Sequence, residues 1–177
     1  MKYINKDIPV LIHNYHSKFL KFNIERLGFN VIEINNSDTY PLGNEVNISI
    51  YAADNCDPKI CGHMFSSITK DIKGSMQLDS LCVIYSKDHV LVNTNDCPFN
   101  IAKKTLKNVK KRFPNIDFAL VGYNNASLFP HCMINYNEEK MKKEILKSKN
   151  IGLKSGLNTL QVLKPKFYMP FAGTYII

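Results

Sequence analysis

Residues 81–98 read LCVIYSKDHVLVNTNDCP and decide the fold, because they join two apolar runs to a polar strand end. The runs Leu81–Ser86 and His89–Thr94 flank Lys87 and Asp88, and this pattern predicts an antiparallel hairpin. The second run ends at Asp96, directly before Cys97 and Pro98. A helical pattern follows at once, so the stretch predicts strand, turn, strand and helix in an α/β protein.

The flanking sequence extends this pattern in both directions. In Asn100–Phe113, Ala102, Leu106 and Val109 recur at helical spacing with lysines opposite them, and Pro114 ends the helix. The N-terminal pattern predicts a strand–helix–strand unit over Ile8–Ile12, Ser17–Leu27 and Phe29–Ile34. Further expected strands are Asn44–Ala52, Phe118–Val121 and Lys166–Phe171, and further expected helices are Glu138–Lys147 and Leu157–Leu163. We expect one α/β domain over residues 1–177, with a mixed β-sheet and helices mainly on one face.

Composition narrows the functional class. The chain has 177 residues, is 45% hydrophobic and carries a net charge of +8. No apolar run approaches the roughly 20 residues that span a bilayer, and no signal peptide is recognisable, which predicts a cytoplasmic protein without membrane contact. Five cysteines, an odd number, argue against a secreted disulfide framework. The lysines are scattered and no nucleic-acid-binding module is recognisable, so we expect no nucleic-acid partner.

Asp96 is the first candidate for chemistry. It stands where an apolar strand ends and a helix begins, and ligands collect at the carboxyl ends of strands in open α/β sheets. The alternative from the residues alone is that Asp96 only caps the following helix or closes a turn.

A second candidate is the segment Ala53–His63, which holds the densest group of ligand-type side chains, with Cys56, Cys61 and His63 among them. Thiolate and imidazole suit zinc or iron, but the spacing Cys-x4-Cys-x-His matches no standard zinc finger. The alternative is a loop held by Asp and Asn turns, with cysteine as a small buried side chain.

The remaining histidines lack a recognisable site pattern. His13 and His16 follow the first strand without a nearby carboxylate, so we interpret both as surface or helix-entry residues. His131 and Cys132 are neighbours in sequence, and neighbouring side chains usually point apart, so the pair does not predict a catalytic dyad.

Four stretches together resemble one family. They are Ala53–Gly62 (ADNCDPKICG), Gly74–Ile84 (GSMQLDSLCVI), Val90–Phe99 (VLVNTNDCPF) and Leu163–Tyr175 (LKPKFYMPFAGTY). The sequence resembles metallo-β-lactamase-fold proteins related to CMP-N-acetylneuraminate hydroxylase and UDP-N-acetylmuramate hydroxylase. The loop Val121–Cys132 also resembles the small-residue loop of that group. The form Pro170-Phe171-Ala172-Gly173 is typical of this hydroxylase-like branch.

The resemblance implies a four-layer αββα sandwich, with metals at the seam between its two sheets. It implies that Asp96 is a metal ligand, and we assign Tyr123, Asn124 and His131 to substrate contact. The His-x-His-x-Asp-His motif of the family is absent from this sequence and would precede Met1. We therefore expect the C-terminal half of a sandwich, with zinc or iron in the complete protein and none bound by this chain. Cys56, Cys61 and His63 remain a candidate structural metal site.

Two functions follow as hypotheses. The first is the C-terminal half of a metal-dependent enzyme, hydroxylase-like or a hydrolase, that acts on a sugar nucleotide or a similar anionic small molecule and is inactive in isolation. The second is a non-catalytic half-domain or interaction module that requires a partner chain. In both, the expected strands are apolar on both faces. We therefore expect a partner in the missing N-terminal half, or self-association through a bare sheet face.

Overall fold

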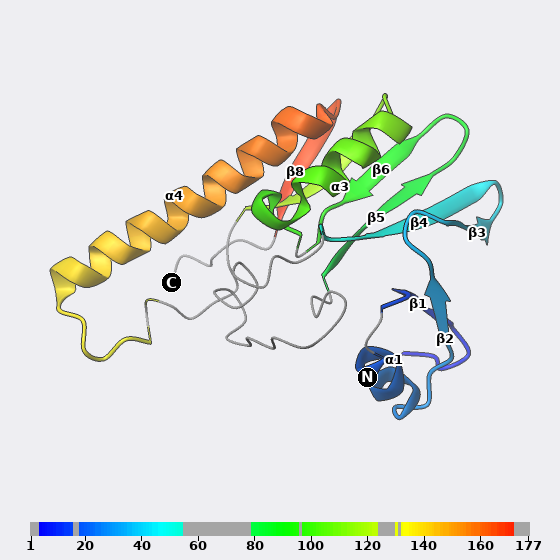
Figure 1. The fold of residues 1–177 in the computed structure, drawn as a ribbon, viewed down its shortest axis with the longest axis horizontal. Coiled ribbons are helices and arrows are strands. Elements are labelled where there is room, and N and C mark those ends of the chain that lie inside the picture. The colour runs from blue at the N-terminus through cyan, green and yellow to red at the C-terminus, as the bar shows by residue number, and fades with distance from the viewer. Residues whose placement is uncertain are drawn as a thin grey trace.

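The computed structural model describes residues 4–15, 18–54, 79–95, 97–123, 130 and 132–171. The N-terminal unit consists of β1 (Val10–His13), α1 (Phe19–Glu25) and β2 (Val31–Ile34). As the sequence predicts, β1 and β2 pair in parallel. They form a two-stranded sheet of their own, separate from the main sheet (Figure 1).

The main sheet has six strands in the order β3-β4-β5-β6-β7-β8. Their bounds are β3 Thr39–Gly43, β4 Val46–Ala52, β5 Ser80–Tyr85, β6 Val90–Asn93, β7 Phe118–Gly122 and β8 Phe167–Phe171. The strands β3 to β6 pair antiparallel, whereas β6, β7 and β8 run parallel. The predicted hairpin is therefore confirmed as β5–β6, and the sheet is mixed.

The helices α3 (Phe99–Arg112) and α4 (Glu138–Leu163) lie side by side on one face of this sheet (Figure 1). The core lies between them and the sheet, and Leu106 of α3 belongs to the same buried cluster as Val83, Val92 and Ala119, which are all fully buried. The backbone N–H of Phe99 donates to Ser155 Oγ at 3.0 Å and ties the start of α3 to α4. The predicted mixed α/β fold with helices mainly on one face is thus confirmed.

The expectation of two helices, Glu138–Lys147 and Leu157–Leu163, is wrong, because α4 continues through both without a break. Gly152 and Gly156 interrupt the apolar pattern, yet both are buried. A Cβ on Gly156 would lie 3.4 Å from Tyr123 Cβ and 3.5 Å from the Gly122 carbonyl oxygen, so the glycine permits close packing of α4 against the end of β7.

Strand β3 was not expected, because Pro41 weakens its strand pattern. Proline is tolerated on an edge strand, and β3 is the edge of the sheet. Arg112 at the end of α3 holds it in place by donating to Thr39 Oγ1 at 2.9 Å and to Tyr51 Oη at 3.0 Å.

Among the helices of the described ranges, none combines the length and the apolar character needed to cross a bilayer.

Candidate functional site

The strand directions bring the ends of several strands to one edge of the main sheet. Strands β4, β6, β7 and β8 run in the same direction, and β5 runs against them. The carboxyl ends of four strands and the start of β5 therefore meet at this edge, which we call the carboxyl edge. In α/β proteins this is where ligands bind.

The turn from β6 into α3 is fixed tightly to β7 at this edge. Thr94 Oγ1 donates to the Leu120 carbonyl at 3.1 Å and accepts from the Gly122 N–H at 3.3 Å. Asn95 adopts a left-handed backbone with φ of 44°, and its N–H donates to Asn93 Oδ1 at 3.0 Å. Asp96, the predicted metal ligand, lies outside the described residues, but both of its neighbours are held in place.

Cys97 completes this turn on the other side of Asp96. Its N–H donates to the Thr94 carbonyl at 2.9 Å, and its side chain is buried in the core. The turn is therefore anchored from within the sheet and from the core.

Gly122 explains how close the β6–α3 turn approaches β7. A Cβ at this position would lie 3.3 Å from the Asn95 carbonyl oxygen. Tyr123, predicted to contact substrate, follows directly and is half-buried at the carboxyl edge. The structure therefore places Tyr123 beside the turn that carries Asp96. The other predicted substrate residues, Asn124 and His131, lie outside the described residues.

Asp54, which follows β4 at the same edge, has a structural role. Its carboxylate accepts from the backbone N–H groups of Lys104 and Thr105, each at 2.7 Å, and from Thr105 Oγ1 at 2.9 Å. Its own N–H donates to the Ile101 carbonyl at 2.8 Å. Asp54 thus bonds to backbone groups inside α3 rather than at its first turn, and its oxygens are occupied by that helix.

The candidate ligands Cys56, Cys61 and His63 lie outside the described residues. The residues on either side of that segment are described, and they converge, because the Ala53 N–H donates to the Asp79 carbonyl at 3.2 Å. The segment 55–78 therefore leaves and re-enters the sheet at the carboxyl edge.

Sequence analysis missed two buried residues near this edge, His13 and Tyr15. The interpretation of His13 as a surface or helix-entry residue is wrong, because it is buried at the end of β1. Its ring centroid lies 4.7 Å from that of Tyr15, and neither ring nitrogen has a hydrogen-bond partner within the described part of the chain. Its burial follows from the packing of β1 against β4, which no local pattern in the sequence signals. His16 lies outside the described residues.

Burial controls the protonation of both side chains. Burial, and secondarily the positive charge of Lys18, lowers the pKa of His13, so the imidazole is neutral at pH 7. Burial raises the pKa of Tyr15 to about 12, although its hydrogen bond with Ser80 opposes the shift. Asp79 and Cys97 are close enough to add to this rise in pKa. Tyr15 therefore lies between the end of β1 and the start of β5.

The described residues alone do not fit a metal ion. Within the described ranges, no three His, Cys, Asp or Glu side chains form a group that could hold one. Asp54 is occupied by α3, and Cys97 is enclosed in the core. The described residues instead place neutral polar groups at the carboxyl edge, including the hydroxyls of Tyr15 and Ser80, which can donate or accept hydrogen bonds.

No protein-family model and no curated protein matches the sequence. Among solved structures, CmlA, a diiron β-hydroxylase from Streptomyces venezuelae, has a TM-score of 0.57 and 14% identity over 93% of this chain. A mutant form of CmlA has a TM-score of 0.58 and 14% identity over 93% of this chain. YhfI from Bacillus subtilis, described as a metallo-β-lactamase fold protein, has a TM-score of 0.44 and 9% identity over 94% of this chain and 63% of its own.

The likeness to CmlA shows that this chain shares the fold of the matched part of that protein. The chain spans only 30–31% of the CmlA chains that it matches. This structural similarity at low identity shows the fold. It does not identify a substrate.

Proposed function

We propose that this chain is the C-terminal half of a metal-dependent enzyme of the metallo-β-lactamase fold, hydroxylase-like or a hydrolase. Its substrate is a sugar nucleotide or a similar anionic small molecule. The complete protein holds zinc or iron, and the isolated chain is inactive.

One observation carries the proposal, namely the convergence of the predicted site positions on the carboxyl edge. The described neighbours of Asp96, the residue Tyr123, and both ends of the segment with Cys56, Cys61 and His63 meet there. These positions come from separate parts of the sequence. Their convergence is what a ligand site requires, and the CmlA-like fold is consistent with it.

The main sheet supports the half-domain interpretation. The strand positions that alternate with the core point away from α3 and α4, and we call them the second face. Its apolar members include Ile48, Ile84, Leu91, Phe118, Leu120, Phe167 and Met169. No described helix covers them, and Phe167 and Met169 are 69% and 49% exposed. An apolar sheet face of this kind is typical of a sheet that another layer covers.

The N-terminal unit indicates where such a layer begins. Strand β1 contacts β4, and Ile50, which alternates with the core residue Tyr51, is buried there. Tyr15 reaches Ser80 on the same side of the sheet. We infer that β1 and β2 belong to the opposing sheet, which the missing N-terminal half would complete.

The free thiols agree with a reducing, cytoplasmic setting, since Cys82, Cys97 and Cys132 all lack a disulfide partner among the described residues.

The decisive experiment compares metal content in the isolated chain and in a longer version that carries a His-x-His-x-Asp-His segment upstream. Elemental analysis is expected to find iron or zinc at stoichiometric level only in the longer version, since structural and catalytic sites need three or four protein ligands. Asp96→Asn should lower that content strongly, and Asp88→Asn, in the exposed β5–β6 turn, should leave it unchanged.

One tightly held metal ion per isolated chain, retained by Asp96→Asn, would contradict the proposal. It would direct attention to Cys56, Cys61 and His63, to be tested by replacement with Ser and Ala.

The alternative, a non-catalytic half-domain that requires a partner chain, is favoured by the same exposed second face. The two are separated by ligand binding in the completed protein. A sugar nucleotide that raises its melting temperature, and no longer does so in Tyr123→Ala, supports the enzyme; no effect of any sugar nucleotide supports the module.

A further inference from the structure

Helix α4 presents a second surface that the proposed enzyme site does not use. Its buried side carries the small residues Gly152, Gly156 and Thr159 against the rest of the protein. On the outer side, Leu146, Leu153 and Leu157 are 59%, 40% and 60% exposed. The N-terminal part of α4 extends beyond the main sheet (Figure 1).

The exposed leucines follow a seven-residue repeat. Leu146, Leu153 and the half-buried Leu160 occupy one position of the repeat, and Asn150 and Leu157 occupy the other. This alternation of steps of four and three residues is the a/d pattern of a helix that packs against another helix. A single Asn at an a position is a recognised means of fixing register in such pairs.

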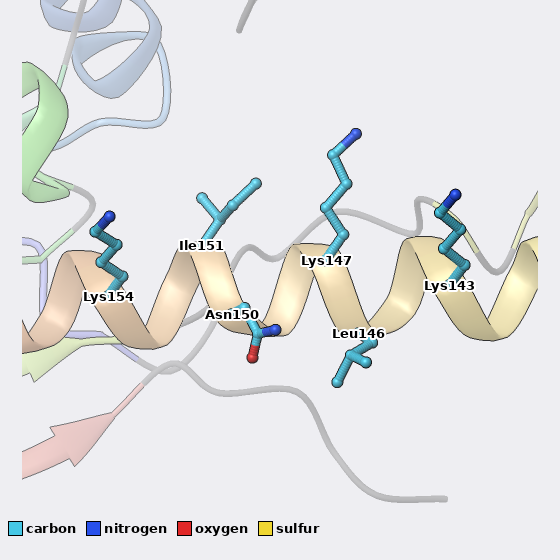
Figure 2. A pocket seen from close by; sticks show the side chains of 6 residues that line it. All are labelled: Lys143, Leu146, Lys147, Asn150, Ile151 and Lys154. Carbon is cyan, nitrogen blue, oxygen red and sulfur yellow. The ribbon is translucent and has the colours of Figure 1, made fainter.

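A surface depression on α4 shares Leu146 and Asn150 with this repeat. It is lined by Lys143, Leu146, Lys147, Asn150, Ile151 and Lys154. These residues form two overlapping sets spaced i, i+3, i+4, i+7, the arrangement that accepts a side chain from a facing helix. Figure 2 shows the three lysines extending from one side of the helix in that view, and Leu146 and Asn150 from the other.

The charges that flank this a/d stripe determine which partner fits it. Residues 140–154 contain six lysines and one glutamate. Lys142 and Lys149 fall at one flanking position of the repeat, and Lys147 and Lys154 at the other. Lys142 pairs with Glu138 and Lys147 with Glu144 on the surface of α4 itself. Exposed pairs of this kind contribute little, so both lysines can exchange them for an intermolecular partner.

We propose that this face of α4 docks an amphipathic helix of another protein, one with apolar a and d positions and Glu or Asp at the flanking positions. A second copy of this chain does not fit, because lysine would face lysine along both flanks. A membrane surface fits less well, since the exposed stripe is narrow, is interrupted by Asn150 and carries no aromatic residue between Lys142 and Lys154.

The test uses a synthetic helical peptide of three heptads, with Leu at a and d, one Asn at a, and Glu at the flanking positions. Fluorescence anisotropy with the whole chain is expected to show saturable binding that weakens with salt. A peptide with Lys in place of Glu should bind at least about tenfold more weakly, because like charges then face each other.

Variants of the chain locate the surface. Lys147→Glu with Lys154→Glu should weaken binding of the acidic peptide about tenfold or more, and so should Leu153→Asn. Lys103→Glu with Lys107→Glu, on the exposed side of α3, changes the net charge equally and should alter binding less than about twofold. Circular dichroism checks that each variant keeps its helices.

Three outcomes would overturn the proposal: equal binding of the acidic and basic peptides, equal weakening by the α3 control, or no saturable binding. Binding to phosphatidylserine vesicles that is lost in Leu153→Asn, without peptide binding, would assign the face to membranes instead.

Discussion

The two faces of the main sheet differ in what covers them, although the same strands supply both. On β6, Val92 points toward α3 and is fully buried, whereas its neighbour Leu91 points to the second face and is only partly buried. The second face is apolar like the first, and on the edge strand β8 Phe167 and Met169 are exposed to solvent, as is Tyr168 on the opposite face of that strand. The composition of a strand therefore does not by itself show how fully each of its faces is covered.

The largest expected effect concerns association through the second face. We expect the isolated chain to self-associate and to bind dyes that report exposed apolar surface, because patches of this kind mark association sites. Phe167→Lys with Met169→Lys should shift the chain toward the monomer in sedimentation at micromolar concentration. Tyr168→Lys, an exposed position on the other face of β8, is the matched control. A dye-silent, cooperative monomer in the unmodified chain would refute the half-domain interpretation.

The next prediction compares the loss of unfolding free energy caused by a leucine-to-alanine substitution on each of the two faces. Leu106→Ala, in the fully buried α3 position, should lower the free energy of unfolding by about 3 kcal/mol. Leu120→Ala on the second face should lower it by about 1 kcal/mol or less, since the side chain is only partly buried. Urea unfolding measures both. Equal losses would mean that the second face is already covered in the isolated chain.

A smaller effect is expected at the carboxyl edge, where Asp54 accepts hydrogen bonds from the backbone of α3. Asp54→Ala removes the acceptor for three hydrogen bonds and should lower the free energy of unfolding by about 1–2 kcal/mol. Asp88→Ala, in the exposed turn, should change it by less than about 0.5 kcal/mol. If Asp54→Ala had no effect, the carboxylate would be available for another role at this edge.

The smallest effect is a pH dependence of thermal stability at the opposite ends of the strands, where Asp117 directly precedes β7. The hydrogen bond from Lys166 Nζ, 2.6 Å from Asp117 Oδ1, and the Val90 N–H hold the pKa of Asp117 below its ordinary value. A carboxyl group with a lowered pKa in the folded state contributes stability above its ordinary pKa and loses it as the pH falls through the lowered value. Asp117→Asn should therefore flatten the decline in thermal stability below about pH 4. Asp88→Asn is the charge control, and a curve identical to that of the unmodified chain would exclude a role for this pair.

Local sequence patterns correctly predicted those strands and helices whose start, periodicity and end are all marked by neighbouring residues. The β5–β6 hairpin and α3 were correct because alternation, a polar turn and Pro114 act within a few residues. The unbroken α4 was not predictable, since Gly152 and Gly156 look like interruptions until their contacts with the end of β7 are known. Strand β3 was missed for a similar reason, because only its edge position makes Pro41 acceptable.

The sequence predicted where β6 ends and α3 begins, and the structure places Tyr123 beside that turn. The burial of His13 and Tyr15 depends on β1 packing against β4, a contact that no local pattern encodes. Asp54 looked like part of a ligand-rich segment, but its oxygens face the backbone of α3. The roles of Asp96, Asn124 and His131 stay predictions.

The hydrogen bond between the Ala53 N–H and the Asp79 carbonyl bears on how this protein can diversify. It joins the two ends of the segment 55–78 at a single point, so a change of length there does not move β4 relative to β5. Lengthening an already closed loop is inexpensive, at about 0.6 kcal/mol for each doubling of its length. The pairing of β4 with β5 is therefore held up to the carboxyl edge by the strands themselves, and changes of length between Ala53 and Asp79 should leave the sheet unchanged.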